Sequence, residues 1–459
     1  MTDDAAPQPP APESFLLERM RLLAVPQALV ALVAAALILA GAGALYRSVH
    51  GDPFWRTSTD FGTYISAAAA VRNGDTPYNV ALYRSKNFYG TSEVYDQYAY
   101  PPPFAEALTA SRAAVGETAT RYIWIAISIA SLAASVALLL RGFGARAPWA
   151  WVALAFGVVL ATKVARSDLY HGQANFLLLF LLTAGLWLYS RGHDAPAGVL
   201  WAITFVIKPF FGVLVLWLLW RRAWKAAAVS VATSATVMLL SFAPIGVSSI
   251  RGWIDASRYN SDAPFAARPD NEAMHGLLLR LFQANPFTQP WLNSAMLFYA
   301  LDAAVIVAVI AIFLLVAPRH GGALNQHGAA SDSSDPPMLL VESGLLISLA
   351  MVYGPLTEGD HFFALLPALT GIIVVAMRAP AAIRMRWLVA ATAWCAFFAL
   401  QAAPIQYRPG VPSESSWFPQ SGIHILLTAQ DGFALAVVVL VLAWAVHSHR
   451  TLQPLDRRT

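Results

Sequence analysis

Residues 294–317 read SAMLFYALDAAVIVAVIAIFLLVA, an apolar stretch with one charged side chain, Asp302. A helix of roughly 20 apolar residues crosses a hydrocarbon core about 30 Å thick, so this stretch is long enough to span a bilayer. Four further stretches share this property, at 24–46, 120–140, 224–244 and 432–448. Soluble proteins rarely bury so many helices of this kind in one chain. The sequence therefore predicts an all-α polytopic membrane protein.

Composition supports the same class. Of the 459 residues, 58% are hydrophobic and 12% are charged, whereas an ordinary soluble domain is about a quarter charged. The net charge of +4 comes from basic residues that lie mainly in short loops, where they set membrane orientation. No basic stripe interleaved with aromatic residues occurs, so nucleic-acid binding is not expected. The single cysteine, Cys395, excludes an intramolecular disulfide and a cysteine-based metal cluster.

Short arginine-rich loops predict the topology. If these loops face the cytoplasm, both termini lie there as well. A single helix over 197–220 would place Arg221 and Arg222 on the wrong face. Pro209 breaks a helix, so two short pieces, 197–207 and 210–220, are expected to enter the membrane and return, as is tolerated where they line a cavity. This arrangement predicts about eleven to thirteen crossings.

The chain is expected to form one transmembrane domain, residues 21–448, between a disordered, proline-rich cytoplasmic segment at 1–20 and a cytoplasmic tail at 449–459. The first apolar segment is too long for a signal-peptide core and is interpreted as a retained helix. The sizeable loops opposite the cytoplasm are 47–119, 245–293 and 403–431, and the sizeable cytoplasmic one is the linker 318–337. Polar residues that could perform chemistry therefore gather on the outer face.

The first polar cluster follows the first membrane helix. Its acid, Asp60, favours a capping role for a helix over 61–73, but a partly desolvated acid at a helix mouth can also act as a general base. The two roles are compatible. Tyr78 and Tyr100 can stack on a sugar ring or lie in the aromatic belt of the membrane interface.

Two further clusters lie at helix breaks. His171, Gln173 and Asn175 flank the start of an apolar helix, where polar amides serve as caps, as helix–helix hydrogen bonds or in substrate binding. Lys208 precedes Pro209 in the broken segment. A lysine at membrane depth is costly and indicates function, with a negatively charged partner expected, unless it snorkels to the surface.

The last two clusters contain histidines. Asn271, His275 and Arg280 fall roughly on one face if that segment is helical. His361, in the run GPLTEGDH at 354–361, can bind a phosphate or orient a hydroxyl, although a histidine at a helix start often has no special role. No phosphate-binding loop of a soluble nucleotide enzyme is present. A phosphorylated donor would therefore arrive through the bilayer or from outside.

Taken in order, these segments resemble glycosyltransferase family 87, a group of polytopic transferases of the GT-C type. The likeness covers about residues 25–400. It rests on Asp60-Phe61, Gly74-Asp75-Thr76-Pro77-Tyr78, Tyr100-Pro101-Pro102, His171-Gly172-Gln173-Ala174-Asn175, Lys208-Pro209, Arg221-Arg222-Ala223-Trp224, Asn271-Glu272-Ala273-Met274-His275-Gly276 and Pro355 to His361. The run 354–361 departs from the family pattern, since only Pro355 and His361 match clearly. We call residues 271–280 the fourth motif and residues 354–361 the fifth. The Asn-Gln-Ser often seen at the fourth motif is Asn271-Glu272-Ala273 here.

The resemblance implies a GT-C bundle in a bacterial cell membrane, with outer loops that carry short helices. It implies transfer of mannose or arabinofuranose from a polyprenyl-phosphate donor to a glycan or glycolipid acceptor on the outer face, with inversion and with Asp60 as general base. The expected donor-phosphate ligands are Lys208, His361 and Arg280. The expected substrate-binding residues are Tyr64, Tyr78, Tyr100, His171, Gln173, Asn175, Asn271 and His275. No cofactor or metal ligand is expected; the partners are the two substrates and membrane lipids. The alternatives are a flippase or transporter of a lipid-linked sugar and a non-catalytic scaffold.

Overall fold

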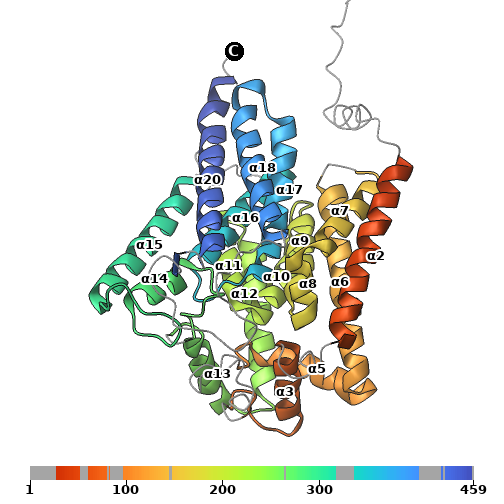
Figure 1. The fold of residues 1–459 in the computed structure, drawn as a ribbon, viewed down its shortest axis with the longest axis vertical. Helices are drawn as coiled ribbons and strands as arrows, with labels where there is room; N and C mark the ends of the chain where they lie inside the picture. The colour runs from red at the N-terminus through yellow and green to blue at the C-terminus, as the bar shows by residue number, and fades with distance from the viewer. Residues whose placement is uncertain are drawn as a thin grey trace, which may run out of the picture.

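A computed structural model describes residues 27–51, 60–79, 82, 97–143, 147–262, 265–316, 335–402, 425–426 and 429–456, and these form helices and no β-strand (Figure 1). The helices are α2 (Gln27–Gly51), α3 (Asp60–Arg72), α5 (Pro102–Val115), α6 (Glu117–Gly142), α7 (Trp149–Ala161), α8 (Lys163–His171), α9 (Asn175–Tyr189), α10 (Asp194–Ile207), η2 (Pro209–Gly212), α11 (Val213–Trp220), α12 (Trp224–Phe242), α13 (Ser248–Tyr259), α14 (Met274–Phe282), α15 (Ala295–Val316), α16 (Pro336–Tyr353), η3 (Gly359–Leu365), α17 (Leu366–Arg378), α18 (Ala381–Ala402) and α20 (Gln430–Asp456).

Within the described residues, seven helical segments are long and apolar enough to cross a membrane. They are α6, α12, α15, α16, η3 with α17, α18 and α20. An eighth span results if α7 and α8, which meet at a bend of 69°, count as one. The predicted all-α polytopic class is confirmed. Counting the shorter apolar helices α2, α9, α10 and α11 as well would give eleven or twelve, so the expected eleven to thirteen crossings stay a prediction.

Several predicted boundaries lie outside the described residues. These are the segment 1–20, most of the linker 318–337 and most of the loop 403–431. Helix α20 continues to Asp456, past residue 448 where the last span was expected to end.

The proline in the broken segment reverses the chain. Helices α10 and α11 are joined by Lys208 and the short turn η2. The ring centroids of Trp201 and Trp217 lie 6.0 Å apart, whereas a continuous helix would separate these residues by about 24 Å. The chain therefore turns back at Lys208–Pro209, as the broken-segment interpretation predicts, and Lys208 lies at the apex.

Two of the predicted basic loops lie near the start of α16 (Pro336–Tyr353), at one end of the bundle. Arg221 forms an ion pair with Glu342 near the start of α16. Arg378 at the end of α17 lies 3.5 Å from Asp335. Opposite this end, α3, α5 and α13 form a layer of short helices, seen at the bottom of Figure 1. Which of the two ends faces the cytoplasm stays a prediction.

Hydrogen bonds join two parts of this layer that are distant in the sequence. Gln97 donates to the carbonyl of Ala256 over 3.2 Å, and Trp253 donates to the carbonyl of Ala99 over 3.1 Å. These bonds connect the first outer loop to α13. Two loops that are expected on the same face are therefore joined, and residues of both lie across a pocket from the break at Lys208–Pro209.

Candidate active site

A pocket of about 290 Å³ lies between this layer and the broken helices. Its wall combines polar side chains from α3, α13 and the segment 97–100 with apolar ones from α16 and Phe210. Six predicted site residues line it: Asp60, Tyr64, Tyr100, Gln173, Lys208 and His361. The other six, Tyr78, His171, Asn175, Asn271, His275 and Arg280, lie outside its lining. The structure thus brings together residues from widely separated motifs.

Two tyrosines form one wall of the pocket. The hydroxyl of Tyr64 donates to Oε1 of Gln173 over 3.2 Å and lies 3.2 Å from the hydroxyl of Tyr100. Tyr78 lies behind this wall and donates to the carbonyl of Tyr100 over 2.9 Å. Burial, with a smaller contribution from the Asp60 carboxylate, raises the pKa of Tyr100 well above its ordinary value. Both phenols therefore stay protonated and present hydroxyl groups to a ligand.

Asp60 is the first residue of α3 and also lines the pocket. Its position is compatible with both of its predicted roles, helix start and site acid. Its Oδ2 lies 3.7 Å from Nδ1 of His171. The turn after His171 lies close to α3, since a Cβ on Gly172 would be 2.7 Å from Cβ of Phe61. Gly172 also has a φ of +65°, a backbone conformation that favours glycine. This turn therefore holds the start of α3 in place.

A buried chain of hydrogen bonds holds Lys208. Its Nζ donates to Oδ1 of Asn175 over 2.7 Å, and Nδ2 of Asn175 donates to Oδ1 of Asp168 over 2.7 Å. Asp168 is fully buried and was not singled out by the sequence analysis. Asn175 links it to Lys208, so Asp168 is a candidate for the negatively charged partner that the sequence predicts, and that assignment stays a prediction.

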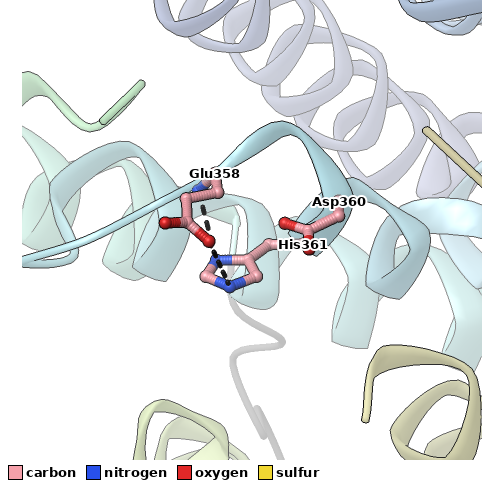
Figure 2. Close-up of side chains that lie close together, drawn as sticks. All are labelled: Glu358, Asp360 and His361. Atoms are coloured by element: carbon pink, nitrogen blue, oxygen red, sulfur yellow. Dashed lines mark hydrogen bonds and ion pairs between the residues drawn. The ribbon is translucent and has the colours of Figure 1, made fainter. Parts of the chain in front are cut away.

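The segment around His361 adds charged residues that the sequence analysis did not single out. Arg268 is buried, lines the pocket and forms ion pairs with Glu358 and with Asp270, the latter at 3.2 Å. Figure 2 shows Glu358, Asp360 and His361 side by side at the start of η3. Nδ1 of His361 accepts from the backbone N–H of Glu358 over 3.3 Å. Burial raises the pKa of Glu358 well above its usual range, and Arg268 opposes this.

The comparisons with known proteins identify the family. The chain matches the model of glycosyltransferase family 87 over residues 98–331, just over half of its length. The protein belongs to glycosyltransferase family 87. Neither the curated proteins nor the solved structures provide a match. It is thus a multi-pass membrane glycosyltransferase that uses a sugar donor and an acceptor.

In this family 87 protein the fourth motif has a structural position. The sequence places Asn271, His275 and Arg280 on one face only if the whole segment is helical. Helix α14 begins at Met274, so Asn271 lies outside the helix that carries the other two residues. Asn271 instead ends the preceding loop, because its side chain satisfies backbone groups on both sides. Its Nδ2 donates to the carbonyls of Ala266 and Pro355, and its Oδ1 accepts from the backbone N–H of Thr357. Asn271 thereby ties the fourth motif to the fifth.

Arg280 and His275 also support the pocket of this transferase from outside its lining. Arg280 is fully buried, and its Nη1 donates to the carbonyls of Arg268 and Asn271. Burial lowers its pKa to about 10. Nδ1 of His275 lies 2.9 Å from Oδ1 of Asp302 in α15, and its Nε2 lies 3.1 Å from the carbonyl of Ser261. Both side chains fix the backbone that carries pocket residues.

Proposed function

We propose that the protein transfers a sugar, mannose or arabinofuranose, from a polyprenyl-phosphate donor to a hydroxyl group of a glycan or glycolipid acceptor. The reaction takes place at the outer face of a bacterial cell membrane, with both chain termini in the cytoplasm. The observation that carries the proposal is that a carboxyl group and an amino group far apart in the chain, those of Asp60 and Lys208, line one pocket of a family 87 transferase.

The reaction is a direct displacement with inversion. Asp60 accepts the proton of the acceptor hydroxyl while its oxygen forms a bond to the anomeric carbon of the donor. The bond between that carbon and the phosphate oxygen breaks, and the electron pair leaves with polyprenyl phosphate. The exposed third of the Asp60 side chain supports this role, because the acceptor has to reach the carboxylate.

The leaving phosphate gains negative charge as the bond breaks. Preorganised cations and N–H donors stabilise such charge without having to reorganise during the reaction. Lys208 is buried and held by Asn175, and His361 lies in the same lining. Arg268 also lines the pocket, and its guanidinium group is a second cation beside Lys208. Lys208, His361 and Arg268 are therefore the donor-phosphate residues that the pocket favours.

The apolar part of the lining supports a lipid-linked donor. Phe210 from the break and Ala350 and Met351 from α16 line the pocket beside the polar groups. These residues belong to segments that continue into the apolar bundle. In our proposal the polyprenyl chain lies along those helices while the sugar occupies the polar part of the pocket.

The test follows radiolabelled polyprenyl-phosphate mannose or arabinose into lipid-linked glycans in membranes that contain the protein. Asp60→Asn should abolish transfer while membrane insertion and thermal stability stay at the wild-type level. The matched control is Asp255→Asn, an exposed acid on α13 outside the family motifs, which should transfer normally. Robust transfer by Asp60→Asn would overturn the assignment of the base. Movement of the labelled lipid without a new glycosidic bond would support the flippase alternative instead.

A further inference from the structure

Asp360 has a buried oxygen that the proposed reaction does not use. The residue is 8% exposed, and its Oδ1 has no hydrogen-bond partner in the described part of the chain. Burying a carboxylate is unfavourable unless its oxygens are hydrogen-bonded, paired or coordinated to a metal. The position of this oxygen therefore indicates a ligand.

The neighbours of Asp360 offer further metal-ligating atoms. One ligand atom each from Glu358, Asp360 and His361 lies within 4.8 Å of the other two (Figure 2). Oε2 of Glu358 and Nε2 of His361 are 4.0 Å apart, which is too long for a hydrogen bond. Ligands placed about 2.1 Å from one ion can lie up to roughly 4.2 Å apart. A small closing movement of these side chains would bring all three to a common ion.

The charge around this cluster favours a cation. Five carboxyl groups, those of Asp60, Asp168, Asp270, Glu358 and Asp360, interact electrostatically in and around it. The basic groups that act on them are Lys208, Arg268 and His171. Arg268 is paired with Asp270 and Glu358, and Lys208 donates to the amide of Asn175. Oδ2 of Asp168 also lacks a hydrogen-bond partner among the described residues. Carboxyl groups therefore outnumber basic groups around the cluster, and a bound cation or a shared proton can balance them.

We propose that Glu358, Asp360 and His361 bind one divalent cation at the edge of the pocket. Two carboxylates and one imidazole suit an ion such as Mn²⁺, which accepts oxygen ligands readily and tolerates a nitrogen ligand. Glu358 and His361 line the pocket, so the ion faces the space assigned to the donor phosphate, and His361 then acts on that phosphate through the ion. That last placement rests on the proposed function, whereas cation binding itself does not.

Binding through Nε2 has one structural requirement. His361 now accepts at Nδ1 from the N–H of Glu358 over 3.3 Å, which leaves the ring proton on Nε2. The ring binds a metal through an unprotonated nitrogen, so the proton moves to Nδ1 and this long hydrogen bond is lost. An alternative occupant of the cluster is a proton shared between carboxylates, and the experiment distinguishes the two.

The test titrates Mn²⁺ into the purified full-length protein in lipid nanodiscs and measures the free ion by electron paramagnetic resonance. We expect one bound ion per chain, and a pulsed spectrum that shows coupling to a histidine nitrogen. His361→Gln should remove this coupling, and Asp360→Asn should weaken Mn²⁺ binding by at least about tenfold, since even ligand-supporting residues contribute 10–100-fold. The nitrogen coupling is measured on the wild-type protein and does not depend on a variant folding.

Asp60→Asn is the matched control, because Asp60 lines the same pocket but lies outside the cluster. It should lose sugar transfer and keep the Mn²⁺ affinity of the wild type, so failure of one proposal does not imply failure of the other. Absence of stoichiometric Mn²⁺ binding or of nitrogen coupling in the wild type would overturn the cation site and leave the shared proton. Equal affinity of Asp360→Asn and wild type would overturn it as well.

Discussion

Lys208 donates a 2.7 Å hydrogen bond to the side-chain oxygen of Asn175, whose nitrogen in turn donates to Asp168 over 2.7 Å. The ammonium group is thereby oriented by a carboxylate that does not touch it. Lys208 also lies 6.0 Å above the ring of Tyr100, so the same group contacts the aromatic wall of the pocket. This relationship leads to the first prediction.

Lys208→Met should lower kcat/KM for the lipid-linked donor by roughly 10- to 150-fold, because a hydrogen bond to a charged group contributes about 1.5–3 kcal/mol. Methionine preserves the length of the side chain, so the fold should persist. The measurement is a donor titration with the radiolabel assay. Lys225→Met, which changes an exposed lysine at the start of α12, should transfer as the wild type does. Unchanged donor kinetics in Lys208→Met would contradict the phosphate role.

Gly172→Ala should inactivate the enzyme, whereas Gly192→Ala should not. Both glycines have positive φ values, +65° and +79°, so alanine costs about 1–2 kcal/mol at either position. Only at Gly172 does the added Cβ collide, with Phe61 beside Asp60, while Gly192 has open space. Thermal unfolding and transfer rates of the two variants separate strain from displacement of α3. Equal activities would argue that the turn does not position Asp60.

Arg268→Met and Arg280→Met should differ in kind. Arg268 lines the pocket, so its loss should raise KM for the donor, and it should also lower the melting temperature because Glu358 and Asp270 lose their ion pairs. Arg280 holds backbone carbonyls, and its removal leaves buried acceptors unsatisfied, at about 1–3 kcal/mol for each. We therefore expect a lower melting temperature for Arg280→Met, with KM near the wild-type value in the folded fraction. An increased KM without any loss of stability in Arg280→Met would restore the phosphate role suggested by the family resemblance.

Trp217→Ala should destabilise the protein by about 3–5 kcal/mol, the usual cost of truncating a buried tryptophan. Trp217 packs against Trp201 between α10 and α11, so the variant loosens the hairpin that carries Lys208. Trp224→Ala removes a largely exposed ring and should change the melting temperature little. Equal melting temperatures for the two variants would show that the hairpin does not depend on this contact.

The sequence predicted the membrane class and the chain reversal well, because both follow from local rules. Long apolar runs determine spans, and Pro209 cannot continue a helix. The number of crossings is less predictable, since helices such as α9 and α10 are apolar but short. Whether a short helix crosses depends on the helices around it, and that information is not local.

The site residues were predictable where their chemistry is unusual for a membrane and unpredictable where their partner is distant. Lys208 attracted attention because a charge at membrane depth is costly. Asp168 and Arg268 did not, because an acid or a base near a loop is ordinary until its burial is known. Asp168 lies in the same short motif as Asn175, and the charge expected opposite Lys208 was the one signal that could have indicated it. Asn271 as a substrate ligand and Arg280 as a donor-phosphate ligand stay predictions; their side chains satisfy backbone groups of neighbouring segments, which the sequence does not indicate.

The amide at position 175 has a consequence for how natural variants are judged. An amide orients the ammonium of Lys208 without cancelling its charge, whereas a carboxylate would neutralise Lys208 and repel Asp168. Asn175→Asp needs only one nucleotide exchange, and substitution matrices score it as mild. We expect a protein with that exchange to insert into the membrane normally and to be inactive in sugar transfer. Genomic surveys that classify transferases as active should therefore evaluate positions 168, 175 and 208 together, because the effect of a change at one position depends on the other two.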